Sequence, residues 1–170
     1  MPRLVSSITT LGVALVLALP VPAGAAPCWR PPVDGVVADP YREPPCPYCA
    51  GNRGLEYRVG SQVPVRAVSS GTVSWAGSIA GTTYVVVRHR NGWRTTYGRL
   101  TRASLRAGDV VVAGAAVGRA SGVFYFGLRT GDGYVDPAPF LGERRGRPRL
   151  VPVDGRAARP APAAPWRCGA

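Results

Sequence analysis

The sequence predicts an all-β protein, an antiparallel β-sandwich or barrel-sandwich hybrid, and three observations carry this prediction. First, 22 Gly and 18 Pro punctuate the 170 residues every few positions, as short strands joined by tight turns require. Second, residues 84–90 and 93–97 are two runs rich in β-branched and aromatic residues on either side of an Asn-Gly pair, which is typical of a β-hairpin. Third, no segment shows a convincing 3.6-residue periodicity.

The hairpin at residues 84–97 has predicted faces and a predicted register. In an extended strand, alternate residues share a face, so one face carries Val85, Val87 and His89 and the other carries Val86, Arg88 and Arg90. We expect Asn91-Gly92 to form a two-residue type I′ turn. That turn pairs Arg90 with Trp93, Arg88 with Thr95 and Val86 with Tyr97.

Shorter apolar runs on both sides of the hairpin predict the remaining strands. A first strand within residues 29–39 is interrupted by Pro and by an Asp-Gly turn, and residues 40–54 read as a loop. The other expected strands cover residues 55–59, 63–67, 72–76, two short pieces within 105–118, and 123–128.

The two ends of the chain differ from this β-domain, which we place at residues 26–141. Residues 1–25 have the pattern of a secretory signal peptide: Arg3, an apolar run from Leu11 to Leu19, and small residues before the cleavage position. Pro27 precedes Cys28, which argues against a lipoprotein anchor at that cysteine. Residues 142–170 form an Arg-, Pro- and Ala-rich tail that we expect to be extended or disordered.

The charge of the chain predicts an anionic partner. All 21 basic residues are Arg, and the formal net charge is +12. Such a balance suits an anionic cell-wall polymer, a phospholipid surface or nucleic acid. The predicted export argues against nucleic acid and favours a secreted, cell-wall-associated protein without a transmembrane segment after signal cleavage.

The four cysteines are predicted to form disulfides, since an even number in an exported protein favours that state over metal or redox chemistry. Cys46-Pro-Tyr-Cys49 matches the active-site tetrapeptide of glutaredoxins, but a redox motif needs a strand before it and a helix after it. Here the tetrapeptide lies in a Pro-rich loop, which indicates a structural staple. Cys28 and Cys168 lie near the ends of the mature chain and could pair, although four cysteines allow three connectivities.

Two motifs rich in Gly and Val have the spacing of barrel-sandwich hybrid folds. The first is Gly60-x-x-Val63-x-Val65-x-Ala67 followed by Gly71-Thr72-Val73, and the second is Gly108-Asp109-Val110-x-x-Ala113-Gly114. Lipoyl and biotinyl carriers share this pattern but attach their cofactor to a Lys, and the chain has none. Sugar phosphotransferase domains of related topology need two histidines, and the chain has only His89. Both classes are therefore excluded.

Residues 32–141 resemble the lysostaphin/LytM-type zinc endopeptidases, which cut peptide cross-links in bacterial cell walls. Eight short motifs carry the resemblance in the family's order, and they are 52–56, 60–67, 71–77, 85–92, 96–100, 108–118, 124–129 and 135–137. The resemblance implies a LytM-like fold of the duplicated-hybrid-motif type.

The same resemblance implies that the catalytic site is degenerate. The family's three zinc ligands are a His, an Asp and a second His, and this chain carries Asn52, Glu56 and Tyr125 at those positions. The two histidines that assist proton transfer are matched by Val123 and Arg99. His89 matches a family position that looks structural or substrate-lining. Amide oxygen and neutral phenol are poor zinc donors, and without the metal nothing lowers the pKa of water.

We therefore expect an exported, non-catalytic LytM-like domain, with no cofactor, that binds peptidoglycan or regulates a cell-wall hydrolase. Candidate groove residues are Trp75, Trp93, Tyr97, Tyr125 and Phe126, together with His89. The alternative is an active zinc endopeptidase with an unorthodox site, for which Cys46, Cys49, Glu56 and His89 are the available donors. A third hypothesis is a disulfide-stapled wall protein anchored by its Arg-rich tail.

Overall fold

The computed structural model describes residues 27–144, 153, 160 and 166–168. The predicted signal peptide and most of the predicted tail lie outside these residues. The described residues form ten strands and one 3-10 helix. In order they are β1 (Val36–Asp39), β2 (Leu55–Arg66), β3 (Gly71–Ile79), β4 (Thr82–Arg88), β5 (Arg94–Ala103), β6 (Val110–Val111), β7 (Ala116–Thr130), β8 (Gly133–Val135), the 3-10 helix Ala138–Phe140, β9 (Glu143–Arg144) and β10 (Trp166–Arg167). The predicted all-β class is confirmed.

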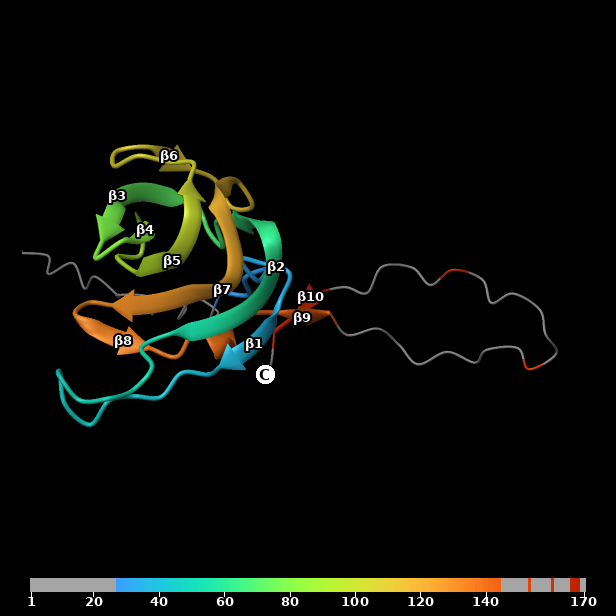
Figure 1. The fold of residues 1–170 in the computed structure, drawn as a ribbon, viewed down its shortest axis with the longest axis horizontal. Coiled ribbons are helices and arrows are strands. Elements are labelled where there is room, and N and C mark those ends of the chain that lie inside the picture. The colour runs from blue at the N-terminus through green and yellow to red at the C-terminus, as the bar shows by residue number, and fades with distance from the viewer. Residues whose placement is uncertain (1–26, 145–152, 154–159, 161–165, 169–170) are drawn as a thin grey trace, which may run out of the picture.

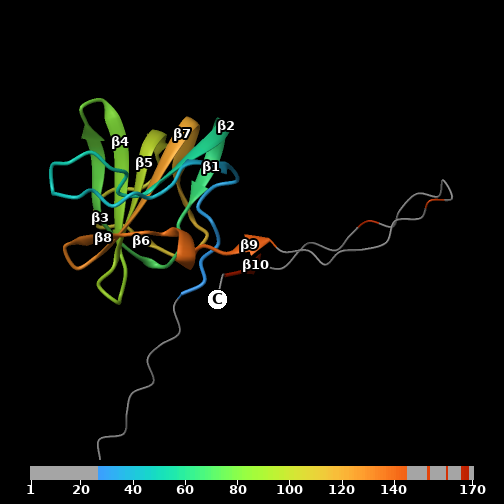
Figure 2. The same cartoon turned by 90° about the horizontal axis from the view of Figure 1, so that it is seen from below.

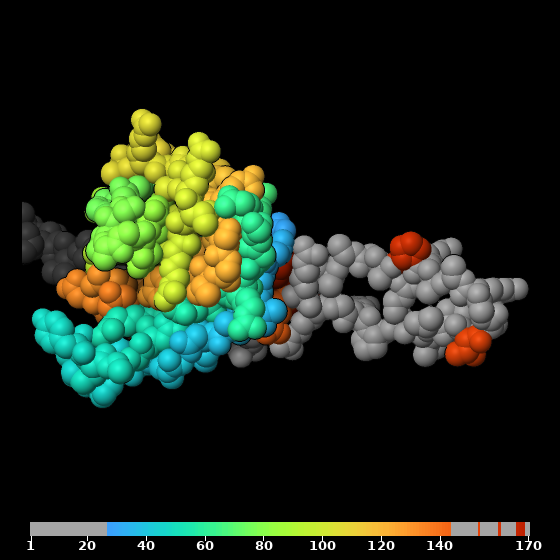
Figure 3. Space-filling view, in the orientation of Figure 1, coloured from blue at the N-terminus to red at the C-terminus, as the bar shows by residue number. Residues whose placement is uncertain are grey.

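One large antiparallel sheet makes up the domain. Its strand order is β1-β2-β7-β5-β4-β3-β6, with β8 paired to the end of β7. The sheet curls around its own inner face, as Figure 1 shows. That inner face holds the core, and its fully buried members include Val65, Val85, Tyr97, Phe124 and Phe126. The loop that precedes β2 runs along the lower edge of the molecule in Figure 3.

The predicted faces of the β4–β5 hairpin are confirmed, but its predicted register is wrong by one residue. Arg88 pairs with Arg94, Val87 with Thr95 and Val85 with Tyr97. The turn contains three residues, and Gly92 closes it at φ 82° while its N–H donates to the His89 carbonyl at 3.0 Å. This three-residue turn keeps the buried residues of both strands on the inner face, whereas the expected two-residue turn would turn Thr95 and Tyr97 outward.

Strand lengths also differ from the prediction. The expected strands 55–59 and 63–67 are one strand, β2, which is irregular between Val59 and Val63 where Gln62 has φ 53°. The expected strand 123–128 is part of the 15-residue β7. A bulge lets a strand continue through a local irregularity, and glycines that read as turns in the sequence lie inside these long strands.

Two disulfides close the structure, Cys28–Cys168 and Cys46–Cys49, and this pairing is one of the three that the sequence left open. The first joins the two ends of the described chain. Beside it, Trp29 N–H donates to the Phe140 carbonyl at 2.7 Å, and Gly142 N–H donates to the Trp29 carbonyl at 2.8 Å. The described pieces of the predicted tail, β9 and β10, pair with each other at this place.

No helix within the described residues has the length and apolar character that a membrane span needs.

Candidate functional site

The residues that match the family's catalytic positions gather on the outer face of β2, β7 and β5. Glu56 of β2 pairs with Tyr125 of β7, and Tyr125 pairs with Gly98 of β5. Arg99 follows Gly98 directly, and Asn52 lies just before β2. Sheet pairing therefore brings together residues that are up to 73 positions apart in the sequence, and the chemistry of this cluster can be judged donor by donor.

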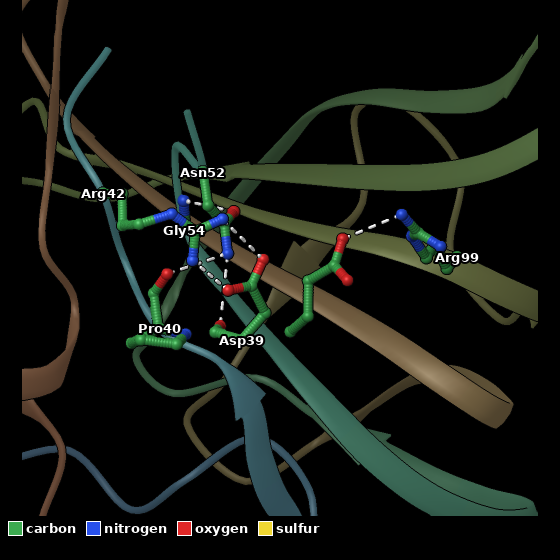
Figure 4. Close-up of polar contacts among 7 residues, drawn as sticks. Asp39, Pro40, Arg42, Asn52, Gly54 and Arg99 are labelled. Carbon is green, nitrogen blue, oxygen red and sulfur yellow. Dashed lines mark hydrogen bonds and ion pairs between the residues drawn. The ribbon is translucent and has the colours of Figure 1, made fainter. Parts of the chain in front are cut away.

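Asn52 is buried and its amide is fully engaged with the chain itself. Its Nδ2 donates to the carbonyls of Pro40 at 3.0 Å and Asp39 at 3.2 Å, while its Oδ1 accepts from the Gly54 N–H at 3.3 Å. Figure 4 shows the Asn52 side chain directed at the Asp39–Pro40 backbone. Because Asp39 ends β1, this amide joins the end of β1 to the start of β2, and its oxygen is a weaker zinc donor than imidazole, carboxylate or thiolate.

Glu56 forms an ion pair with Arg99, whose Nη2 lies 2.8 Å from Oε1, and Figure 4 draws this contact as the dashed line to Arg99. Arg99 has φ 57° and sits where the β5–β7 pairing shifts register between Gly98 and Leu100. Both side chains are partly exposed, so the pair contributes only about 0–1 kcal/mol to stability. Its effect on the site is larger: a fixed guanidinium charge beside Glu56 repels a divalent cation.

The Tyr125 side chain packs closely against three glycines. A Cβ added to Gly54 would come within 2.8 Å of its ring, one added to Gly98 within 3.1 Å, and one added to Gly127 within 2.8 Å of its hydroxyl. The hydroxyl donates to the Arg53 carbonyl at 2.9 Å. Burial raises the pKa of Tyr125 well above its usual range, with smaller contributions from Tyr134, Tyr84 and Glu56, so the phenol stays neutral. A neutral phenol that donates its proton to a carbonyl is not a zinc ligand.

The donor set at this cluster therefore does not fit zinc. Catalytic zinc needs three imidazole, carboxylate or thiolate donors and an open position, and Glu56 alone is of the right type. Over the described residues, no group of three or more His, Cys, Asp and Glu side chains is placed to hold a metal. Val123 is 36% exposed on β7 and has no titratable group, so it offers no proton transfer.

The alternative donor set of Cys46, Cys49, Glu56 and His89 is corrected by the structure. The two cysteines are joined as a disulfide, so neither is a thiolate. His89 is buried, its Nδ1 lies 2.9 Å from the Ser70 carbonyl and its Nε2 lies 2.9 Å from Thr95 Oγ1. Burial lowers the pKa of His89 below its usual value. The lowered pKa favours the neutral imidazole, with Nδ1–H donating to the Ser70 carbonyl and Nε2 beside the Thr95 hydroxyl.

The expected groove residues are also corrected in part. The side chains of Tyr97 and Phe126 are fully buried with ring centroids 5.5 Å apart, so they belong to the core and offer no surface to a ligand. Trp93 packs edge-on against Trp29 and Phe140, at 5.9 and 5.1 Å between centroids, near the disulfide-closed end. Thr95 and Tyr97 at the start of β5 are buried on the inner face, and Trp93 just before the strand packs toward the same side, so neither Trp93 nor Tyr97 is available to the groove.

An open groove does lie on the outer face beside Tyr125. It has a volume of about 450 Å³ and is lined by Ser74, Trp75, Ile79, Tyr84, Val86, Arg94, Thr96, Arg129 and Tyr134. Trp75, which the sequence did suggest, is 36% exposed there, and Tyr134 is 40% exposed. Tyr84 connects the groove to the catalytic cluster, because a Cβ on Gly98 would meet the rings of both Tyr84 and Tyr125. Tyr84 and Tyr134 were missed because their place depends on the register of β4 and β8.

Comparison with known proteins identifies the family. Residues 50–137, just over half of the chain, match the model of peptidase family M23, and the chain belongs to that family. A search of curated proteins returned no match.

Solved structures share this fold. The catalytic domain of the prophage-encoded M23 protein EnpA from Enterococcus faecalis is 26% identical with a TM-score of 0.54, and the match covers 66% of this chain and 94% of that one. The catalytic domain of the antimicrobial peptidase lysostaphin from Staphylococcus simulans is 21% identical with a TM-score of 0.56, covering 62% and 91%. Helicobacter pylori Csd3 is 21% identical with a TM-score of 0.61, covering 75% of this chain and only 38% of Csd3.

Proposed function

We propose that this chain is an exported, non-catalytic M23 domain that binds the peptide part of cell-wall peptidoglycan, and that it can thereby regulate a wall hydrolase. One observation carries the proposal: each family ligand position is engaged within the chain, Asn52 with the backbone of β1, Glu56 with Arg99, and Tyr125 with the Arg53 carbonyl. An amide, a carboxylate paired with a guanidinium and a neutral phenol together make a poor donor set for zinc. The chain keeps the fold of the family without its zinc-dependent catalysis.

The outer-face groove supports a binding role. Trp75 and Tyr134 present partly exposed aromatic faces, and Thr96 adds a hydroxyl group on the floor. Flat aromatic surfaces combined with a few polar groups suit an extended, small-residue peptide, since the rings contribute contact area at a low cost in side-chain entropy. The groove adjoins the former catalytic cluster through Tyr84, so a peptide that once crossed the metal site would still reach it.

A binding assay with insoluble peptidoglycan tests the proposal. Trp75→Ala should weaken sedimentation with peptidoglycan about tenfold, which corresponds to the loss of one aromatic anchor of about 1.4 kcal/mol. Tyr48→Ala is the matched control, because Tyr48 is 99% exposed in the loop before β2 and does not line the groove. Thermal melts of both variants should match the unaltered protein. Equal binding by both variants would show that the groove does not bind peptidoglycan.

The same preparation separates the binding role from the two alternatives. An active zinc endopeptidase would release soluble peptides from the peptidoglycan, and a chelator would stop the release. A protein anchored only by its Arg-rich tail would lose all wall binding in about 0.15 M salt, where the Debye length is about 8 Å. The groove contacts are short-ranged, so we expect part of the binding to persist in salt.

A further inference from the structure

A row of arginines crosses the sheet at one end of the domain. The pairing registers place Thr72 opposite Arg88, Arg88 opposite Arg94, and Arg94 opposite Arg129. Residues that are directly opposite in neighbouring strands share a face and lie about 4.8 Å apart in the pairing direction. Three guanidinium groups therefore follow one another across β4, β5 and β7 on the outer face.

Few acidic side chains neutralise this row of arginines among the described residues. Like charges in directly opposite positions destabilise a sheet. Among the described residues, Asp132 is the one carboxylate that forms an ion pair with the row, 3.4 Å from Arg94, and its side chain is fully exposed. Arg129 donates to the Asp132 carbonyl at 3.1 Å and stacks 4.8 Å from the Tyr134 ring centroid, yet its Nε is buried without a partner. Within the described part of the chain, the side chain of Arg88 has no hydrogen bond or ion pair.

A hollow opens beside the free end of the row. Its volume is about 710 Å³, and Arg88 and Arg90 line it together with the polar residues Ser70, Thr72 and Asn91. Like Arg88, Arg90 has no side-chain partner within the described residues. None of the residues that line the hollow, all of them described, is acidic. The hollow is thus a concave basic surface with hydroxyl and amide groups, which is the composition that binds phosphate.

Exposed valines flank the same hollow. Val110 and Val112 are 81% and 63% exposed, while Val111 between them is 2% exposed, as the alternation of a strand requires. Val110 is opposite Thr72, so it continues the row of Arg88 and Arg94 toward the sheet edge. A hydrated polymer would leave these apolar side chains in water, whereas a lipid surface would cover them.

The N-terminal segment leaves the domain at this place. Pro27, the first described residue, lines the hollow, and Figure 2 shows the β4–β5 turn, β6 and β8 toward the end of the molecule where the blue segment begins. The apolar run that ends at Leu19 lies eight residues upstream of Pro27, a distance of at most about 28 Å when fully extended. While that run is in a membrane, this end of the domain is held beside the lipid surface.

We propose that this end of the domain, formed by Arg88, Arg90, Arg94, Arg129, Val110 and Val112 and here called the basic end, binds bilayers that contain anionic phospholipids. The guanidinium groups pair with lipid phosphates, and the two valines enter the headgroup region. Arg94 and Arg129 also line the outer-face groove, whereas Arg88, Arg90, Val110 and Val112 line the separate hollow, so substitutions of these four residues test lipid binding apart from peptide binding. The basic end gives the exported protein a second surface that faces the membrane.

Co-sedimentation of the oxidised, exported protein with vesicles tests the proposal. Vesicles of phosphatidylcholine with one quarter phosphatidylglycerol, in about 0.1 M salt, are compared with vesicles of phosphatidylcholine alone. Arg88→Gln/Arg90→Gln should weaken binding to the anionic vesicles by roughly 30-fold, from about fivefold for each arginine near an anionic surface. Val110→Ser/Val112→Ser should weaken it by about three- to tenfold. Each substitution is at an exposed or flanking position, and thermal melts verify the fold.

The matched control is Arg58→Gln/Arg102→Gln, which removes the same charge from two exposed arginines on β2 and β5 outside the basic end. It should change binding by less than threefold. Equal losses for the two arginine pairs would reduce the effect to net charge and overturn the proposal. So would a failure to prefer anionic vesicles. A site for a soluble phosphate polymer would also contradict the proposal. In that case Arg88→Gln/Arg90→Gln would weaken binding of inorganic polyphosphate, while Val110→Ser/Val112→Ser would bind vesicles as well as the unaltered protein does.

Discussion

Removing the Cys28–Cys168 disulfide should destabilise the protein far more than removing Cys46–Cys49. The two bonds close loops of very different length, with sequence separations of 140 and 3 residues. In the chain-entropy model, the stabilisation grows as 1.5RT times the logarithm of the loop length. The ratio of the two separations then corresponds to a difference of about 3 kcal/mol at 25 °C, and this difference is more secure than either absolute value. The longer bond also fastens the β9–β10 pair to Trp29.

Urea unfolding of Cys28→Ser/Cys168→Ser and Cys46→Ser/Cys49→Ser measures this difference. The first variant should lose about 3 kcal/mol more of its free energy of unfolding than the second. For a domain of this size that corresponds to a melting temperature lower by roughly 6–12 °C. Equal losses in the two variants, or a larger loss in the second, would refute the reasoning that the long bond acts by constraining the unfolded chain.

Two further predictions concern the packing and the buried histidine. Gly98→Ala should cost about 1–3 kcal/mol, because its Cβ would lie 2.5 Å from the Tyr84 ring, whereas Gly60→Ala, whose Cβ meets nothing closer than 3.6 Å, should be nearly neutral by urea unfolding. His89 has a pKa lowered by burial, so the unfolded chain takes up a proton before the folded protein does. The free energy of unfolding should therefore fall as the pH drops below about 6.5, and the pH dependence should be weaker in His89→Asn; a parallel pH profile in that variant would contradict the assignment.

The hairpin shows how far the sequence could predict the fold. The period of two along a strand predicts that Val85, Val87 and His89 share one face, and all three are buried in the structure. The Asn-Gly pair predicts the position of the turn but not its length. A three-residue turn is required because Thr95 and Tyr97 must share the inner face with Val85 and Val87. The length of the turn is therefore indicated by the return strand, in which Thr95 and Tyr97 share one face.

The candidate site was predictable in its residue types and not in its contacts. Donor chemistry alone argues against zinc at Asn52 and Tyr125. It does not say that Arg99 reaches Glu56, because that contact depends on a left-handed residue at a register shift in β5. The prediction of the groove aromatics was partly wrong for a related reason. Strand register decides which ring lines a groove and which fills the core, and a shift of one residue exchanges the two faces.

Zinc binding tests the central claim most directly. The exported protein, incubated with an equimolar amount of zinc and freed of unbound metal, is measured for zinc per chain and for release of soluble peptide from peptidoglycan. We predict well under one zinc per chain and no release, with Glu56→Gln giving the same values as the unaltered protein. One zinc per chain that is lost in Glu56→Gln, together with peptide release that a chelator abolishes, would contradict the account.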